Sequence, residues 1–272
     1  MEEYLETYIV DSFTDETFKG NPAGVCVLKN EIDDRIMLSI AKELGLSETA
    51  FIRQSIEPNK FTIRYFSPKM EIPLCGHATL ASAQVLFEKY PVVHRFHFVT
   101  IENVDLLIAR DGEMIAMEFP VYDTIPAEAP TQLLHALGIN MIVNSVYNDE
   151  TKILLLEISD SKVLEKLTPD FEALYRSHHS INGVLVTAPS NKDGFDFESR
   201  YFWPWSGTNE DPVTGGTHTF LAKYWSEKLH KTKMKSFQCS ERTGYMEVEL
   251  LNERKFIIRS KARIVLEGKL RM

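Results

Sequence analysis

The feature that most restricts the fold is a helix-length segment with almost no charged side chain. From Gly76 to Phe87 the chain reads Gly-His-Ala-Thr-Leu-Ala-Ser-Ala-Gln-Val-Leu-Phe. A helix that is small or apolar on every side is buried inside a domain rather than laid on its surface. The second half contains a similar segment, Thr217–Trp225, and each of the two begins beside glycine. The sequence therefore predicts two central helices, one in each half.

Short runs rich in β-branched and aromatic residues surround both segments. The clearest amphipathic helix is Asp33–Leu44, with Asp33 or Asp34 available as its N-cap. We predict an α+β fold of two pseudo-symmetric domains, residues 1–120 and 121–272. Each is expected to be a many-stranded, mostly antiparallel sheet or barrel wrapped around its apolar helix, and the last strand could pack on the first half. The chain has no G-x-G-x-x-G between a strand and a helix, which argues against a doubly wound parallel sheet.

Charge and cysteine usage exclude several functional classes. The net charge is −9 over 272 residues, without a run of Lys and Arg, so binding to nucleic acid or anionic lipid is not expected. Cys26, Cys75 and Cys239 are far apart, which argues against a disulfide framework and a zinc knuckle. The acidic N-terminus has no secretory pattern, and the apolar runs are much shorter than a membrane span. We expect a soluble, cytoplasmic protein.

Polar residues gather at the starts of both apolar helices. Cys75 and His77 flank Gly76, and Asp211 and Thr217 flank Gly215. Free backbone N–H groups at a helix start favour an anion such as a substrate carboxylate. The alternative interpretation is that the two glycines merely turn the chain.

Glu48 lies between the predicted helix and an apolar strand. Its carboxylate could cap a turn or face solvent, or it could point into a cleft and act as a general acid and base. His77 is expected to be neutral, because the helix dipole disfavours its protonated form. The close histidine pairs, His94 with His97 and His178 with His179, have no carboxylate or cysteine at a helpful spacing, so no metal site is predicted.

Several motifs, taken in order and spacing, strongly resemble the phenazine-biosynthesis PhzF-like isomerase family, whose fold is that of diaminopimelate epimerase. The motifs are F-x-G-N-P-A-G-V from Phe18, L-x-E-T-A-F from Leu46, Y-F-S-P from Tyr65, E-x-x-L-C-G-H-A-T-L-A from Glu71, F-P from Phe119, R-x-F-x-P from Arg200 and E-D-P-V-T-G from Glu210.

The resemblance implies an active site in a cleft between the two domains, no cofactor and a homodimer. The characterised phenazine-pathway member isomerises trans-2,3-dihydro-3-hydroxyanthranilate by moving a hydrogen from C3 to C1. Glu48 matches the position of the family's catalytic acid and base. His77 and Asp211 match its substrate-contacting residues, and Gly76 and Gly215 match its helix-start glycines.

The chain departs from the family pattern at one position. The family reads D-P-x-T-G-S-A, and Gly216 stands where its substrate-contacting serine is found. Gly216 keeps only a backbone N–H, and Thr217, one residue on, offers an alternative hydroxyl. Epimerases of this fold use two opposed cysteines, but Thr214 stands opposite Cys75 here. A single carboxylate base, Glu48, is therefore expected rather than two thiols.

These observations predict a cofactor-independent isomerase that moves a proton within a small carboxylate-bearing metabolite. The predicted catalytic residue is Glu48, and the predicted substrate-binding residues are His77, Asp211, Gly76, Gly215, Gly216 and Thr217. The alternative is a non-catalytic small-molecule-binding or interaction protein that retains the fold, with Trp203 or Trp205 filling the cleft.

Overall fold

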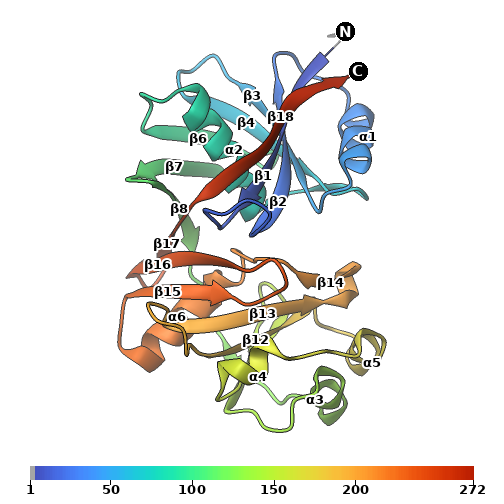
Figure 1. Ribbon diagram of the computed structural model, residues 1–272, viewed down its shortest axis with the longest axis vertical. Helices are drawn as coiled ribbons and strands as arrows, with labels where there is room; N and C mark the ends of the chain where they lie inside the picture. Colours follow the sequence, from blue (N-terminus) through green and yellow to red (C-terminus); the bar gives the residue numbers. More distant parts are fainter. Residues whose placement is uncertain (1–3) are drawn as a thin grey trace. The chain divides into compact units, whose positions relative to one another are not determined.

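The computed structural model describes residues 4–272 and divides the chain into two compact units (Figure 1). Unit 1 contains the residues up to Glu118 together with 258–272, and unit 2 contains 119–257. The chain leaves unit 1 within β8 (Met114–Pro120) and returns within β17 (Lys255–Ser260). The last strand of the chain, β18 (Ala262–Arg271), thus belongs to unit 1.

In the sheet of unit 1, β1 lies between β2 and β18. β1 pairs antiparallel with both β2 and β18, β2 pairs parallel with β3, and β3 pairs antiparallel with β4. The sheet continues from β4 to β5 and β6, and then through β7 to β8. These strands are β1 (Tyr4–Ser12), β2 (Asn21–Leu28), β3 (Thr49–Gln54), β4 (Lys60–Phe66), β5 (Glu71–Ile72), β6 (Arg95–Val99), β7 (Asp105–Asp111) and β18 (Ala262–Arg271).

The uncharged segment forms α2 (Gly76–Lys89), and ten of its fourteen residues are buried. It packs against β1, β2, β3 and β18, so strands of the sheet enclose it as the absence of charge predicts. The amphipathic helix α1 (Asp34–Leu44) lies outside, on β3 and β4. Asp33 is its N-cap and accepts a hydrogen bond from the Arg35 N–H, and Gly45 ends it in the left-handed conformation.

Unit 2 has a sheet whose central strand, β13, pairs with β12, β14 and β15. On one side the order continues from β12 to β11, β10 and β9, and on the other from β15 to β16. These strands are β9 (Ile125–Pro126), β10 (Asn144–Asn148), β11 (Ile153–Glu157), β12 (Gly183–Pro189), β13 (Phe197–Trp203), β14 (Thr208–Asp211), β15 (Lys233–Gln238) and β16 (Gly244–Asn252).

Helices cover both faces of the unit 2 sheet. On one face, Trp225 of α6 (His218–Leu229) stacks on Phe197 with ring centroids 5.4 Å apart and donates a hydrogen bond to Thr187. On the other face, leucines of three short helices pack against β11, β12 and β13. The short helices are α3 (Thr131–Leu137), α4 (Ser161–Glu165) and α5 (Phe171–Ser177). Unit 2 therefore has a second helical layer besides the predicted central helix.

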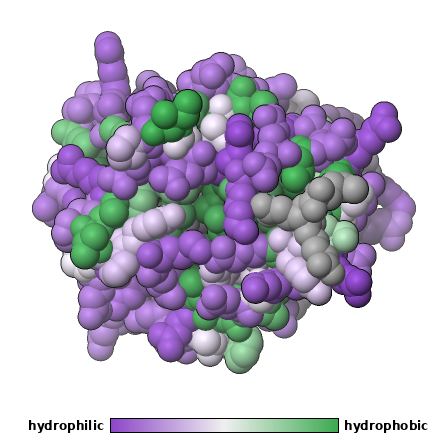
Figure 2. All heavy atoms as spheres, turned by 90° about the horizontal axis from the view of Figure 1, so that it is seen from above, coloured by the Kyte–Doolittle hydropathy of each residue, from purple (hydrophilic) through white to green (hydrophobic). Residues whose placement is uncertain are grey.

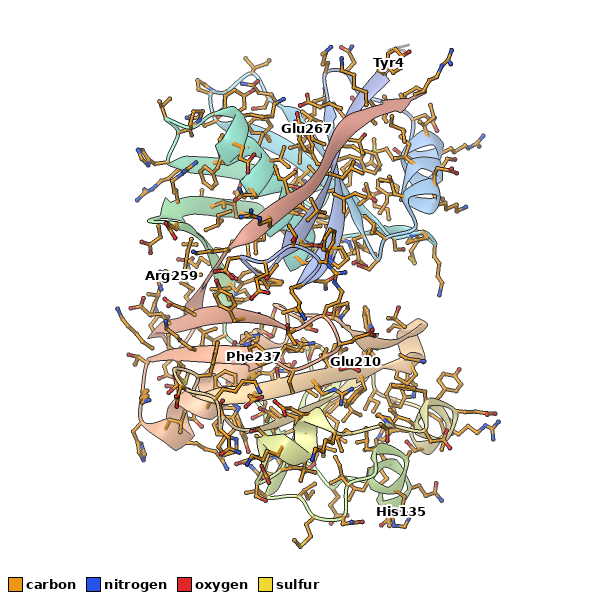
Figure 3. All side chains as sticks on the ribbon, viewed as in Figure 1. Tyr4, His135, Glu210, Phe237, Arg259 and Glu267 are labelled. Atoms are coloured by element: carbon orange, nitrogen blue, oxygen red, sulfur yellow. The ribbon has the colours of Figure 1, made fainter. Side chains whose placement is uncertain are left out.

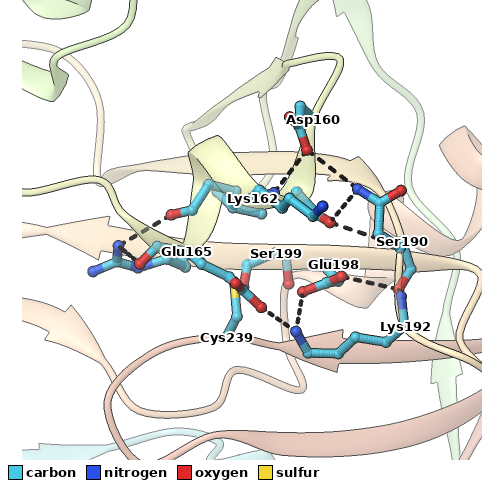
Figure 4. Close-up of polar contacts among 12 residues, drawn as sticks. Asp160, Lys162, Glu165, Ser190, Lys192, Glu198, Ser199 and Cys239 are labelled. Carbon is cyan, nitrogen blue, oxygen red and sulfur yellow. Dashed lines mark hydrogen bonds and ion pairs between the residues drawn. The ribbon is translucent and has the colours of Figure 1, made fainter.

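A buried ion pair in unit 2 involves none of the predicted site residues. Glu198 on β13 is fully buried, accepts a hydrogen bond from Ser190 and pairs with Lys192 at 3.3 Å (Figure 4). Lys192 also contacts Glu165 of α4. These contacts tie the loop between β12 and β13 to α4. Burial raises the pKa of the adjacent Cys239 thiol to about 12, so this thiol stays protonated.

The face seen in Figure 2 is ordinary for a globular protein. The view in Figure 2 is mostly hydrophilic, with hydrophobic side chains scattered in small groups. Among residues 4–272, no helix combines the length and the apolar character needed to cross a membrane.

Candidate active site

Four polar side chains of unit 1 lie together at the start of α2. Nε2 of His77 is 3.2 Å from Oε2 of Glu48, and Nδ1 of His77 is 3.4 Å from Sγ of Cys75. The Ser47 hydroxyl is 3.4 Å from His77 Nε2. The Glu48 side chain is only 13% exposed and that of His77 10%. The structure therefore brings together the predicted acid–base residue and one predicted substrate-binding residue.

The backbone around Glu48 is fixed by a glycine on the neighbouring strand. The Gly24 N–H donates to the Glu48 carbonyl at 3.1 Å. A Cβ at Gly24 would lie 2.8 Å from Thr49 Oγ1 and 3.0 Å from Leu44 Cδ1, so no larger residue fits without a shift. The glycine of the N-P-A-G motif thus lets β2 approach the end of α1 and the start of β3, where Glu48 lies.

Hydrogen bonds hold the start of α2 in place. Cys75 is its N-cap with an extended backbone, and its side chain makes no capping bond. The Thr79 hydroxyl donates to the Cys75 carbonyl at 2.7 Å and accepts from the Tyr65 hydroxyl at 2.6 Å. The Ser12 hydroxyl donates to the His77 carbonyl at 2.7 Å. These bonds come from β1 and β4, so the sheet of unit 1 positions Cys75 and His77.

The His77 imidazole is neutral at physiological pH. Burial lowers its pKa below the ordinary value, and the Glu48 carboxylate opposes this shift without cancelling it. The sequence predicts a neutral His77 from the helix dipole, whereas the larger physical cause in the structure is burial. A neutral imidazole has one donor and one acceptor nitrogen, so it can hold a polar group while the carboxylate beside it takes a proton.

The other predicted residues form a second group, in unit 2. Asp211 ends β14 and accepts a hydrogen bond from the Thr214 hydroxyl at 2.5 Å. Gln238 bridges the turn, since its Nε2 donates to the Asp211 carbonyl at 2.7 Å and its Oε1 accepts from the Thr214 N–H at 2.8 Å. Gln238 is therefore a positioning residue that the sequence analysis missed, because it lies on β15, far from the motif in sequence.

The turn before α6 has one exposed and one buried glycine. Gly215 is buried and Gly216 exposed, and their carbonyls accept bonds from the His218 and Thr219 N–H groups. Thr217 is 1% exposed, and its hydroxyl donates to the Thr214 carbonyl at 3.0 Å. This bond holds the turn closed. The substrate-binding role of Thr217 stays a prediction. Its hydroxyl proton is already donated within the turn, so the hydroxyl could contact a substrate only as an acceptor or after breaking this bond.

His218, the first residue of α6, is a buried neutral imidazole. Its Nδ1 bonds the Thr214 carbonyl at 3.2 Å, and its Nε2 bonds the Ser236 hydroxyl at 2.9 Å. Burial lowers its pKa to about 4. His218 therefore stabilises the turn between Asp211 and α6 by linking it to Ser236 on β15.

We expect the buried His218 to make stability depend on pH. In the unfolded chain the His218 imidazole binds a proton below about pH 6.5, whereas in the folded chain it does so only near pH 4. The free energy of unfolding should therefore fall as pH drops from 6.5 to 4, by on the order of 3 kcal/mol. Urea unfolding at several pH values measures this slope. His218→Gln should flatten it and His135→Gln, at an exposed position labelled in Figure 3, should not; an unchanged slope in His218→Gln would contradict the assignment.

Arg200 connects the motif strand β14 to the rest of unit 2. Its Nε and Nη2 donate to the two carboxylate oxygens of Glu210, both at 2.7 Å, and its Nη1 donates to the Leu167 carbonyl at 2.7 Å and the Leu164 carbonyl at 3.2 Å. Glu210, labelled in Figure 3, immediately precedes Asp211. The arginine and glutamate of the two sequence motifs thus form one buried pair that positions Asp211.

Trp205 lies in the short 3₁₀ helix Pro204–Ser206 and is held within unit 2. Its Nε1 donates to the carbonyls of Tyr175 and His178, at 3.1 and 2.8 Å, and its ring packs on the core beneath α3, α4 and α5. Trp203 packs on the ring of Tyr201 at a centroid distance of 5.6 Å. The two tryptophans named in the alternative interpretation thus have packing partners in their own unit.

Comparison with known proteins gives a consistent result over the whole chain. A family model described as "Phenazine biosynthesis-like protein" matches residues 10–268. A phenazine biosynthesis-like domain-containing protein of Bos taurus is 41% identical and covers 98% of this chain and 99% of its own length. An uncharacterized isomerase of Pseudomonas aeruginosa is 39% identical over the same shares of the two chains.

Solved structures agree with the family match. A putative phenazine biosynthesis PhzC/PhzF protein from Clostridium difficile has a TM-score of 0.89 at 37% identity, covering 98% of this chain and 100% of that one. A hydroxyproline epimerase from Agrobacterium vitis, 9% identical, has a TM-score of 0.58 and covers 99% of this chain and 91% of that one, which shows a shared fold. The predicted fold class is therefore confirmed.

Proposed function

Because this chain belongs to the phenazine biosynthesis-like protein family, we propose that it is an isomerase that moves a proton within a small carboxylate-bearing metabolite. A relative that is 39% identical over nearly the whole chain is named an isomerase. The shared fold with an epimerase supports the same reaction class. The single observation that carries the mechanism is the partly buried Glu48 carboxylate 3.2 Å from the neutral His77.

In the proposed mechanism, Glu48 removes a proton from one carbon of the substrate and returns it to another. A carboxylate placed within hydrogen-bond distance of the reacting group can serve as base and then as acid in one turnover. His77 holds a polar substituent of the substrate in one of two ways. Either the ring nitrogen that does not face Glu48 bonds the substituent, or the substituent takes the place of the Glu48 carboxylate at Nε2. The N–H groups at the start of α2, near Gly76, favour the substrate carboxylate.

Asp211, Gly215, Gly216 and Thr217 are the residues of unit 2 that we propose contribute to substrate binding. The support is their match to the family motif and the network through Gln238 and Arg200 that fixes Asp211. We further propose, from the family resemblance, that the enzyme needs no cofactor and acts as a homodimer, and, from its few and scattered cysteines, that it is cytoplasmic.

Proton exchange with solvent tests this proposal directly. Wild-type protein is incubated in D₂O with trans-2,3-dihydro-3-hydroxyanthranilate and a set of cyclic amino acids, and proton NMR follows the carbon-bound hydrogens. We expect deuterium uptake or isomerisation in at least one compound, and retention of that activity in Cys75→Ser. If the wild type exchanges but a correctly folded Cys75→Ser does not, the base is a thiol. No exchange in any compound would favour the non-catalytic alternative.

Replacing Gly216 by serine restores the hydroxyl of the family motif. A Cβ at Gly216 would meet no described atom within 4 Å, and its backbone is outside the left-handed region. We therefore expect Gly216→Ser to change the free energy of unfolding by no more than about 0.5 kcal/mol and to lower KM for the exchanging substrate. Gly194→Ser is the control: that site is equally open, but its φ of +82° makes serine strained. Greater destabilisation of Gly216→Ser than of Gly194→Ser would contradict the open geometry.

A further inference from the structure

The side chains at the start of α2 have the donor set of a soft-metal site. Glu48, Cys75 and His77 offer one carboxylate oxygen, one thiol sulfur and one imidazole nitrogen, all within 4.8 Å of one another. Zn²⁺ prefers these three ligand types, and three protein ligands with a fourth position open to water or substrate are typical of catalytic zinc sites. Among residues 4–272, no other group of three such ligands is this close.

The distances fit tetrahedral coordination after small side-chain movements. Around tetrahedral zinc, neighbouring ligand atoms are about 3.3–3.7 Å apart. Here His77 Nε2 is 3.2 Å from Glu48 Oε2 and 3.9 Å from Cys75 Sγ. The separations from the Cys75 sulfur to the His77 nitrogen and to the Glu48 oxygen, the latter no more than 4.8 Å, both have to shorten, which takes small movements of the Cys75 and Glu48 side chains.

We propose that Glu48, Cys75 and His77 bind one Zn²⁺ or a similar thiophilic divalent cation per chain, with a solvent molecule or the substrate carboxylate as fourth ligand. On binding, the Cys75 thiol loses its proton to solvent and its sulfur bonds the metal. Its place at the N-terminus of α2 favours the thiolate. The backbone bonds from Ser12 and Thr79 hold the two α2 ligands in position before the metal arrives.

Metal binding at this position would switch the enzyme off reversibly. This consequence rests on the proposed function, because it requires Glu48 to be the acid and base. A carboxylate bonded to a cation is a much weaker base, because the positive charge stabilises its deprotonated form, so the cation competes with turnover. The binding itself does not depend on what the protein catalyses.

Cobalt absorption tests the binding without any assay of activity. Metal-free protein is titrated with Co²⁺, which reports a cysteine ligand through a thiolate-to-cobalt charge-transfer band in the near ultraviolet, and Zn²⁺ is then added to displace it. We expect one equivalent of Co²⁺ to produce the band and Zn²⁺ to abolish it. Cys75→Ser should remove the band, and Glu48→Gln and His77→Gln should each weaken binding by at least about tenfold.

Two control variants separate this site from other thiols and histidines. Cys239→Ser removes a half-buried thiol in unit 2, and His178→Asn breaks the adjacent histidine pair; both should bind cobalt as the wild type does. The proposal is overturned if no band forms, if the band survives Cys75→Ser, or if Glu48→Gln and His77→Gln bind as tightly as the wild type. If metal binds as expected but proton exchange persists at full metal occupancy, the site stands and the role of Glu48 as base fails.

Discussion

Glu48→Gln is expected to lower the rate of proton exchange by about 10²–10⁴-fold, the usual contribution of a positioned general acid and base. Glutamine has nearly the same shape and can still bond His77, but it cannot accept a proton from carbon. The fold should be retained, because the backbone at residue 48 is held by Gly24 rather than by the side chain. The initial rate of deuterium uptake and the thermal unfolding curve, measured on the same preparation, check both parts.

Glu43→Gln is the matched control, since Glu43 is an exposed glutamate on the nearby helix α1. It should exchange at the wild-type rate. Exchange at that same rate in Glu48→Gln would remove Glu48 from the mechanism. A loss of exchange accompanied by a lower unfolding temperature would instead show that Glu48 supports the structure of the site.

Arg200→Met should be the most destabilising of the substitutions considered, at about 3–5 kcal/mol. The Arg200 and Glu210 side chains are only 10% and 17% exposed, so removing one partner leaves a largely buried charge without its counter-ion. The carbonyls of Leu164 and Leu167 also lose their shared donor. Denaturant unfolding measures the loss in free energy.

Two further variants identify the cause of this loss. Arg176→Met removes an arginine that also pairs with a glutamate, but at a position with 71% exposure, and should cost no more than about 1 kcal/mol. The double variant Arg200→Met/Glu210→Gln removes the unpaired charge and should recover part of the stability. A double variant less stable than Arg200→Met alone would show that the unpaired carboxylate is not the main cost.

The sequence predicts the elements of the fold wherever one physical signal dominates. Lack of charge marks α2 as buried, and the N-cap Asp33 and the apolar spacing define α1 to within one residue. β14 has no strand signal of its own in the sequence, because its residues lie inside a stretch rich in turn formers and pair with β13 through tertiary contact. The helical layer of α3, α4 and α5 cannot be predicted from local sequence, since the burial of these helices depends on a sheet surface that is assembled from distant strands.

The candidate site was predictable in part. The family motifs identify Glu48 and His77, and the structure brings them within 3.2 Å. Sequence spacing alone could not place Cys75 beside both, because that depends on how β3 and α2 meet. Gln238 lies outside every motif, and the motifs that contain Arg200 and Glu210 do not reveal that the two side chains pair, since a positioning role appears only when side chains from separate strands are seen in contact.

The pairing of β1 with β18 has a consequence for how the protein is made. The pairing runs from Tyr4 opposite Arg271 to Ser12 opposite Ala262, so β1 cannot complete its pairing until β18 has been synthesised. A ribosome therefore releases every residue of unit 2 before unit 1 has its final strand. During that interval β1 presents an open row of N–H and C=O groups to any other strand. The nascent unit that carries Glu48 is thus the one most exposed to mispairing with another chain, and it is the last to close.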